Sequence, residues 1–100
     1  MDKREAIAKV KQYKLLLGKH FDLESVYLFG SYAQDTNKED SDIDVAVVVT
    51  NITGDFFSVN PLLWKLRRQV DDRIEPILIH KNEDKSGFLE EIQRYGIKIT

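Results

Sequence analysis

Two acidic residues in the stretch "SDIDVAVVV" stand where an apolar run begins, and their spacing suits metal-ion chemistry. Asp42 and Asp44 are separated by one residue and precede the apolar residues 45–49. Strand side chains alternate between two faces, so the pair points to one face, with Cα atoms roughly 6.5–7 Å apart. Two carboxylates at that spacing repel each other, and they can converge on one cation or bracket two. The pair therefore predicts a cation site where a buried strand starts.

The ligand types favour a hard divalent cation over zinc. The chain has no cysteine, and neither of its two histidines lies near the pair in sequence. Carboxylate oxygens suit Mg²⁺ or Mn²⁺. The neighbouring acids Asp35, Glu39 and Asp40 are interpreted as a solvated loop without a catalytic role. The alternative for the pair itself is a solvated strand start in which aspartate serves as a turn former.

Gly30 and Ser31 stand between a short strand and a predicted helical turn over 31–34, followed by a polar loop over 35–41. Glycine lets the backbone approach a phosphate closely, and N–H groups at the start of a helical turn favour anions. The hydroxyl of Ser31 adds a donor. The pair therefore predicts a grip for a phosphate tail beside the two carboxylates.

Glu75, in the strand-like stretch "RIEPILIH", is the best candidate for a third carboxylate. It should face one side of this strand while Ile74 faces the other. In that position it would complete the ligand set of the cation and help to deprotonate an incoming hydroxyl group. The rival acids Asp71 and Asp72 are interpreted as loop residues at a helix end. The alternative for Glu75 is a plain exposed strand acid.

Hydrophobic spacing predicts the elements that position these residues. A helix is expected over 3–17, begun by a capping box of Asp2 and Glu5 and ending near Gly18. Strands are expected over 25–29, 42–49 and 73–80, with a last strand in "IKI". Apolar residues on both faces of the 42–49 strand predict a central position, and Pro76 predicts an edge or a bulge for the 73–80 strand.

Two further helices are expected after a loop over 50–55. Asn60 is the predicted cap of the first, with Pro61 at its first helical position. Ser86 is the predicted cap of the second, which Gly96 should end in a left-handed conformation. The resulting order of helices and strands predicts an α+β fold, with a small mixed β-sheet packed by helices.

Basic and aromatic residues outside this centre have plainer interpretations. Lys65, Arg67 and Arg68 are interpreted as a solvated helix face, with binding of a phosphate or an acidic partner as the alternative. Trp64 is interpreted as either a core or an interface residue. Tyr32, beside Ser31, either stacks on a base or packs into the core.

Length and composition limit the classes of protein. One hundred residues predict one domain spanning 1–100, and 42% hydrophobic with 32% charged residues argue against disorder. The apolar runs fall far short of the roughly 20 residues of a membrane-spanning helix, and no signal-peptide core is apparent. The net charge of −2 gives no basic excess for non-specific nucleic-acid binding. A cytoplasmic location is the expectation.

The stretch "GSYAQDTNKEDSDID" resembles the signature of minimal nucleotidyltransferases in the DNA polymerase β-like superfamily. That signature is Gly-Ser, ten residues, and Asp-x-Asp, and Gly30, Ser31, Asp42 and Asp44 match it. "RIEPILI" resembles the later strand that bears the third carboxylate, so that role falls to Glu75. The ending "FLEEIQRYGIKI" resembles the family's final helix and Gly-Ile strand, so the resemblance extends over most of the chain.

The resemblance implies a polymerase β-like palm fold and a magnesium-dependent transfer reaction. Two Mg²⁺ ions would be held by Asp42, Asp44 and Glu75, and Gly30 and Ser31 would hold the β- and γ-phosphates of ATP. A nucleoside monophosphate, AMP from ATP, would pass to a hydroxyl acceptor with release of pyrophosphate.

The resemblance also implies a partner, a helical HEPN-type toxin whose tyrosine this chain would modify as an antitoxin. Two alternatives stay open. One is a non-catalytic module that binds nucleotide or partner by contact, because Asp35 stands where many family members carry glycine. The other is transfer to a small molecule such as an aminoglycoside.

Overall fold

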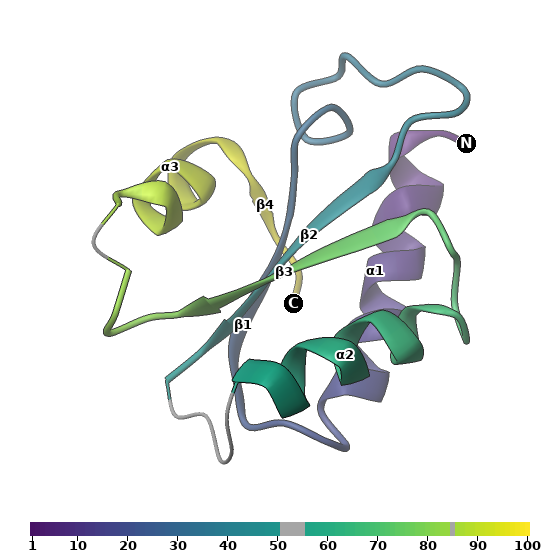
Figure 1. Cartoon of the computed structure of the whole chain (residues 1–100). Coiled ribbons are helices and arrows are strands. Elements are labelled where there is room, and N and C mark those ends of the chain that lie inside the picture. Colours follow the sequence, from purple (N-terminus) through teal and green to yellow (C-terminus); the bar gives the residue numbers. More distant parts are fainter. Residues whose placement is uncertain (51–55, 85) are drawn as a thin grey trace.

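The computed structural model describes residues 1–50, 56–84 and 86–100, and it contains one four-stranded mixed sheet (Figure 1). In chain order the elements are α1 Lys3–Leu17, β1 Leu23–Phe29, β2 Ile43–Val49, α2 Phe56–Arg67, β3 Ile74–His80, α3 Phe88–Tyr95 and β4 Ile97–Lys98. The strand order is β3-β2-β1-β4, with β2 antiparallel to β1 and parallel to β3. The predicted α+β class and the predicted element order are confirmed.

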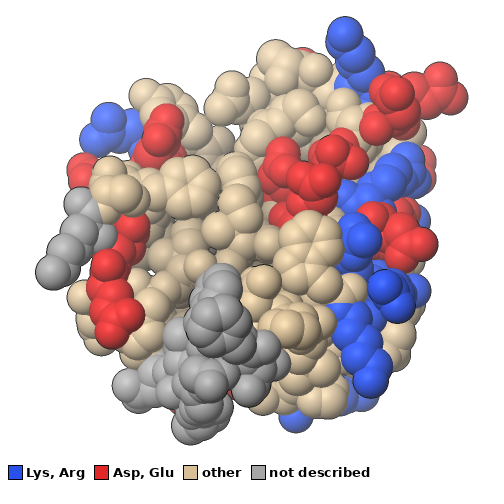
Figure 2. Space-filling model, in the orientation of Figure 1, with Lys and Arg blue, Asp and Glu red and all other residues tan. Residues whose placement is uncertain are grey.

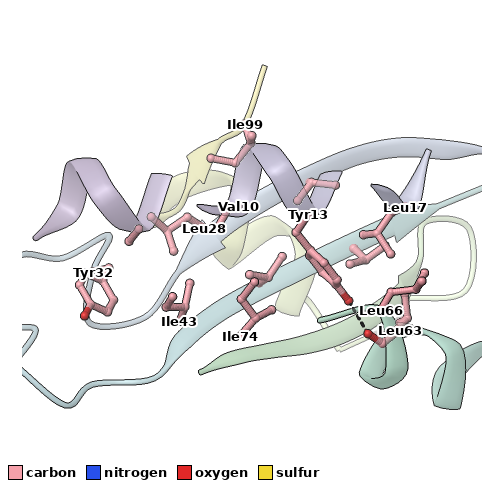
Figure 3. Close-up of a cluster of buried hydrophobic side chains, with 14 of the residues drawn as sticks. Val10, Tyr13, Leu17, Leu28, Tyr32, Ile43, Leu63, Leu66, Ile74 and Ile99 are labelled. Atoms are coloured by element: carbon pink, nitrogen blue, oxygen red, sulfur yellow. Dashed lines mark hydrogen bonds between the residues drawn. The ribbon is translucent and has the colours of Figure 1, made fainter. Parts of the chain in front are cut away.

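Helix α1 begins and ends as its sequence predicts. The Asp2 carboxylate accepts a hydrogen bond from the Glu5 N–H (2.8 Å), which satisfies one of the free donors of the first turn. The face of α1 that meets the sheet is buried. On this face, the hydroxyl group of Tyr13 donates a hydrogen bond to the Leu63 carbonyl of α2 (2.8 Å; Figure 3). This hydrogen bond joins the two helices that cover one face of the sheet.

Strand β2 lies in the middle of the sheet and is buried on both sides. Val45 and Val47 pack into the core under α1 and α2, whereas Ala46 and Val48 pack toward α3. All four side chains are at most 1% exposed. The predicted central strand is confirmed. Because side chains alternate along a strand, Asp44 points to the same side of the sheet as Ala46 and Val48, the side of α3.

The predicted start of α2 at Asn60 is wrong. The helix begins at Phe56, so Pro61 lies inside it and removes one backbone donor. Val59 is buried in line with Leu63 and Leu66 at helical spacing. Burial of this longer stripe outweighs the local Asn-Pro start signal, because packing commonly overrides propensity. Most of the loop predicted over 50–55 lies outside the described residues.

Helix α3 ends at Tyr95, directly before Gly96 as predicted, but its N-cap and the conformation of Gly96 differ from the prediction. The helix begins at Phe88 after Gly87, which has φ +81°, while the Ser86 hydroxyl accepts from the Phe88 N–H (3.2 Å). Gly96 is extended (φ −88°, ψ 173°) rather than left-handed. A Cβ there would lie 2.6 Å from the Ile92 carbonyl oxygen, so glycine is needed for close packing of the helix end.

Strand β3 is an edge strand, which confirms one of the two positions predicted from Pro76. Strand β4 pairs with β1, which confirms the predicted last strand. No helix within the described ranges combines the length and the hydrophobicity needed to cross a membrane.

Candidate active site

Asp44 and Glu75 are neighbours across the parallel strands β2 and β3. They are register partners, so their side chains point to the same face, that of α3. Asp42 precedes Asp44 by two residues and belongs to the same face by alternation. Asp44 and Glu75 are half-buried, whereas Asp42 is exposed. Figure 2 shows a compact group of acidic side chains near the middle of the view, with basic side chains beside it on the α1 side.

The pKa values of Asp44 and Glu75 are raised first by burial and then by neighbouring like charge. Burial raises the pKa of Asp44, and the charge of Asp42 raises it further. Burial likewise raises the pKa of Glu75, with the charges of Asp42 and Asp44 acting in the same direction and that of Arg67 opposing them. A bound cation would relieve this repulsion.

Gly30 lies directly against the carboxylate of Asp44. Its φ is +73°, a left-handed conformation that side chains disfavour. A Cβ added at this position would overlap the carboxylate, with Cγ of Asp44 only 3.1 Å away. Glycine is therefore required by backbone conformation and by space, and the bend after β1 is held beside the acidic group.

The residues after Gly30 form a helical turn. The Gln34 N–H donates to the Gly30 carbonyl (3.1 Å), and the Thr36 N–H donates to the Ser31 carbonyl (2.9 Å). Tyr32 is fully buried in the core beneath the turn, which answers the choice between stacking and packing (Figure 3).

The backbone conformation at Asp35 accounts for the glycine that the nucleotidyltransferase signature often carries at this position. Its φ is +59°, in the left-handed region where glycine is the favoured residue. Aspartate tolerates this region better than most side chains do. Its carboxylate also accepts a hydrogen bond from Lys3 at the start of α1 (3.2 Å).

The chemistry of the donor set fits a divalent cation, although the side chains do not form a closed ligand shell. Within the described residues, no group of three or more His, Cys, Asp or Glu side chains is arranged to hold a metal ion. Asp42, Asp44 and Glu75 nevertheless supply hard oxygen donors on one face of adjacent strands. Burial and neighbouring negative charge raise the pKa of Asp44 and of Glu75, and a bound cation would offset that negative charge.

Asp71, a rival for the third acid, is occupied elsewhere. Its carboxylate pairs with Lys9 of α1 (2.6 Å) and with Arg73 (3.3 Å). Burial raises the pKa of Asp71, but hydrogen bonds from Lys9 and Arg73 outweigh this and hold it well below the ordinary value. Asp71 therefore fastens the α2–β3 turn to α1.

Arg67 has a role that its sequence context does not reveal. It was interpreted as part of a solvated helix face, but it donates to the carbonyls of Asp72 and Ile74 at the start of β3. Its guanidinium lies 4.7 Å from the ring centre of Trp64, which is a surface residue with 37% exposure. Arg67 thus positions the strand that carries Glu75.

A small pocket beside Gly30 was also not predicted. It has a volume of about 130 Å³ and is lined by Phe29, Gly30, Gln34, Phe88, Glu91, Ile92 and Tyr95. Phe29 and Phe88 meet edge to face with ring centres 5.8 Å apart. The lining comes from β1, the turn and α3, so no single stretch of sequence signals it.

Three comparisons relate this chain to known proteins. The family model described as "Polymerase beta, Nucleotidyltransferase" matches residues 11–100. A protein of Methanocaldococcus jannaschii, provisionally named a protein adenylyltransferase, is 32% identical over 79 residues, or 77% of this chain and 79% of that protein.

Two solved structures resemble the fold. A provisionally named nucleotidyltransferase from Sulfolobus solfataricus superposes with a TM-score of 0.72 at 19% identity, covering 96% of this chain and 80% of that one. A toxin-antitoxin structure solved with AMP-PNP superposes with a TM-score of 0.66 at 29% identity, covering 92% of this chain and 72% of that one.

Proposed function

The chain belongs to the polymerase beta nucleotidyltransferase family, and on this basis we propose that it transfers AMP from ATP to a hydroxyl group of a partner protein. The similarity to a provisionally named protein adenylyltransferase supports a protein acceptor. The similarity to a toxin-antitoxin structure solved with AMP-PNP supports an adenine nucleotide and a toxin as the partner. The HEPN-type identity of that toxin, with tyrosine as the modified residue, is part of the proposal.

The reaction needs an acceptor oxygen, a phosphate chain and a base in one place. The acceptor oxygen forms a bond to the α-phosphorus of ATP, while the bond from that phosphorus to the oxygen bridging the β-phosphorus breaks. Pyrophosphate leaves with that oxygen, and AMP remains on the acceptor. The hydroxyl proton passes to the carboxylate of Glu75 and then to solvent.

The chain's own groups would orient these parts. The backbone N–H groups after Gly30 and the Ser31 hydroxyl would hold the β- and γ-phosphates. Asp42 and Asp44 would hold two Mg²⁺ ions, with Glu75 on the acceptor side; the ions, when bound, neutralise charge on the phosphates. Arg67 keeps β3, and with it Glu75, in register. Catalysis would rest on positioning and charge neutralisation.

The observation that carries the proposal is the joint placement of Gly30, Asp44 and Glu75. Gly30 touches the Asp44 carboxylate, and Glu75 is the register partner of Asp44 on the next strand. The bend after β1 and two carboxylates thereby meet at one end of the sheet, which supports binding of a phosphate chain and cations there. A strand start with solvated aspartates would need neither contact.

A transfer assay tests the proposal. The protein is incubated with ATP, Mg²⁺ and the product of the neighbouring gene, and mass spectrometry follows that product. A gain of one or more AMP groups is expected, with loss of the gain in Asp42→Asn and Asp44→Asn. Asp40→Asn is the matched control, because Asp40 is an exposed acid in the adjoining loop and should leave transfer unchanged.

A second candidate function is neutralisation of the partner by contact alone. It is favoured by the open arrangement of the three carboxylates, which do not form a ligand shell. In that case the partner would bind with no gain in mass, and Asp44→Asn would leave its binding unchanged.

A further inference from the structure

Strand β3 leaves one edge unpaired. Among the described residues its strand partner is β2, in a parallel register that runs from Ile43–Ile74 to Val49–His80. The outer edge is therefore a row of backbone groups that another strand can meet (Figure 1). Ile77, in the middle of β3, is 40% exposed.

Two hydrogen bonds fix which backbone groups point outward. The Ile43 N–H donates to the Arg73 carbonyl (2.8 Å), and the Lys81 N–H donates to the Val49 carbonyl (2.8 Å). Backbone groups of successive strand residues point to opposite sides, so the odd-numbered residues of 73–81 face β2. The outward-facing residues are Ile74, Pro76, Leu78 and His80.

Several of these outward groups are already satisfied or absent. The Ile74 N–H donates to the Asp71 carbonyl (3.1 Å), and the Ile74 carbonyl accepts from Arg67 (3.0 Å). The His80 carbonyl accepts from the Glu83 N–H (3.0 Å). Pro76 has no N–H. Four groups then have no hydrogen-bond partner among the described residues: the Pro76 carbonyl, the Leu78 N–H, the Leu78 carbonyl and the His80 N–H.

The two N–H donors and two carbonyl acceptors of this edge match the acceptors and donors of the same edge in another copy. We propose that a second copy of this chain pairs with β3 in antiparallel register, centred on Leu78. The N–H and carbonyl of each Leu78 bond to those of the other copy. The His80 N–H of each copy donates to the Pro76 carbonyl of the other. Pro76, which has no N–H, lies opposite the His80 carbonyl of the other copy. That carbonyl needs no further donor, because it already accepts a hydrogen bond from the Glu83 N–H of its own chain.

Side chains agree with this register. Ile77 of one copy lies opposite Ile79 of the second copy, which covers the exposed side chain of Ile77. Glu75 lies opposite Lys81 of the second copy, so opposite charges meet. Lys81 also pairs with Glu24 of its own chain (3.0 Å), and its side chain is 45% exposed. The second copy would thereby add a cation at the margin of the acidic group.

A copy of this chain fits the edge better than an unrelated strand does. In an unrelated strand, the carbonyl opposite Pro76 would usually have no hydrogen-bond donor. In a second copy of this chain, the carbonyl at that position is that of His80, which already accepts a hydrogen bond from Glu83. The pairing has two-fold symmetry, so it closes at two copies and leaves neither β3 edge open. The inference rests on the backbone groups of the β3 edge, so it holds whether or not the chain catalyses the transfer reaction.

Cysteine cross-linking tests the register directly, because the chain has no cysteine of its own. In an antiparallel hydrogen-bonded pair, Cα atoms are about 5.5 Å apart, within the span of a disulfide. Leu78→Cys should form a dimer on mild oxidation. Lys98→Cys, on β4 at the other edge of the sheet, is the control and should stay monomeric. Equal cross-linking of both variants, or of neither, would overturn the proposal.

Molar mass in solution provides the second test. Light scattering after gel filtration should show a concentration-dependent dimer for the unmodified chain. Leu78→Pro removes an outward N–H, and Ile77→Lys places a charge opposite Ile79 of the second copy; each should weaken dimerisation at least tenfold. Circular dichroism checks that both variants fold. A monomer at all concentrations, or a dimer that neither folded variant weakens, would contradict pairing through β3.

Discussion

Gly30 and Asp44 are in such close contact that a single methyl group on residue 30 would overlap the carboxylate. The contact joins the bend after β1 to the first residues of β2, although fourteen positions separate the two residues (44 − 30). It holds the backbone donors of the bend beside the acidic group.

Gly30→Ala should impair both stability and function. Forcing a left-handed conformation on alanine costs about 1–2 kcal/mol of unfolding free energy, and the methyl group would also displace Asp44. Gly87→Ala is the matched control, because Gly87 has φ +81° and no atom within 4 Å of an added Cβ. Urea unfolding should show losses in both variants, while ATP binding should fall in Gly30→Ala alone. Equal ATP binding by the two variants would show that the contact with Asp44 has no functional role.

Asp35→Gly should stabilise the turn after Gly30. Glycine relieves the left-handed strain at this position, and the ion pair with Lys3 that is lost is exposed and contributes little. We expect a gain of up to about 1 kcal/mol in unfolding free energy, measured by urea titration. Asp35→Asn, which keeps a side chain suited to this conformation, should change stability less. A loss of stability in Asp35→Gly would mean that the ion pair outweighs the backbone strain.

Asp71 should contribute to stability at neutral pH but not in strong acid. Its folded-state pKa is depressed below the unfolded value of about 3.9, so its contribution is present above that pH and is lost as the pH falls through the folded-state pKa. Asp71→Asn should cost about 1–3 kcal/mol at pH 7, because the charged hydrogen bonds to Lys9 and Arg73 are weakened. Unfolding curves at pH 7 and pH 2.5 measure the cost. A cost that is equal at both values would rule out this linkage.

Two glycines at helix ends should respond oppositely to alanine. At Gly96 an added Cβ would lie 2.6 Å from the Ile92 carbonyl oxygen and 3.1 Å from that of Leu28, so α3 must move away from β1. A loss of about 2 kcal/mol or more in unfolding free energy is expected, in the range of overpacking. At Gly18 the backbone is right-handed helical, and the nearest atom lies 3.5 Å from the added Cβ. Gly18→Ala should therefore stabilise by about 0.4–1 kcal/mol, and thermal unfolding of both variants compares them.

The parts of the fold that the sequence predicts well are those set by local patterning. The capping box at Asp2 and Glu5 fixed the start of α1, and the apolar residues of β2 predicted a strand covered on both faces. Pro76 predicted an edge because proline lacks the N–H that an inner strand needs. Each signal lies within a few residues of the feature that it predicts.

The errors arise where contacts distant in sequence decide. The start of α2 follows the burial of Val59 rather than the Asn60-Pro61 signal, and the conformation of Gly96 follows its packing against Ile92 and β1. The pairing of Arg67 with β3 and the pocket beside Gly30 depend on side chains from several elements. Hydrophobic periodicity contains no information about such contacts.

In the candidate site, too, local spacing predicts some features, whereas others depend on contacts distant in sequence. Spacing alone placed Asp42 and Asp44 on one face, and strand alternation assigned Glu75 the face opposite Ile74. That Glu75 is the register partner of Asp44 depends on the pairing of β2 with β3, which no local pattern specifies.

Counting bound ions tests the central claim most directly. Mn²⁺ replaces Mg²⁺, AMP-PNP replaces ATP, and electron paramagnetic resonance counts the bound ions in the unmodified chain and in Asp42→Asn, Asp44→Asn, Glu75→Gln and the control Asp40→Asn. We predict two ions with nucleotide in the unmodified chain and the control, loss of both ions in Asp44→Asn and weaker binding in the other two. Unchanged ion binding in Asp44→Asn and Glu75→Gln would contradict a metal centre built on adjacent strands.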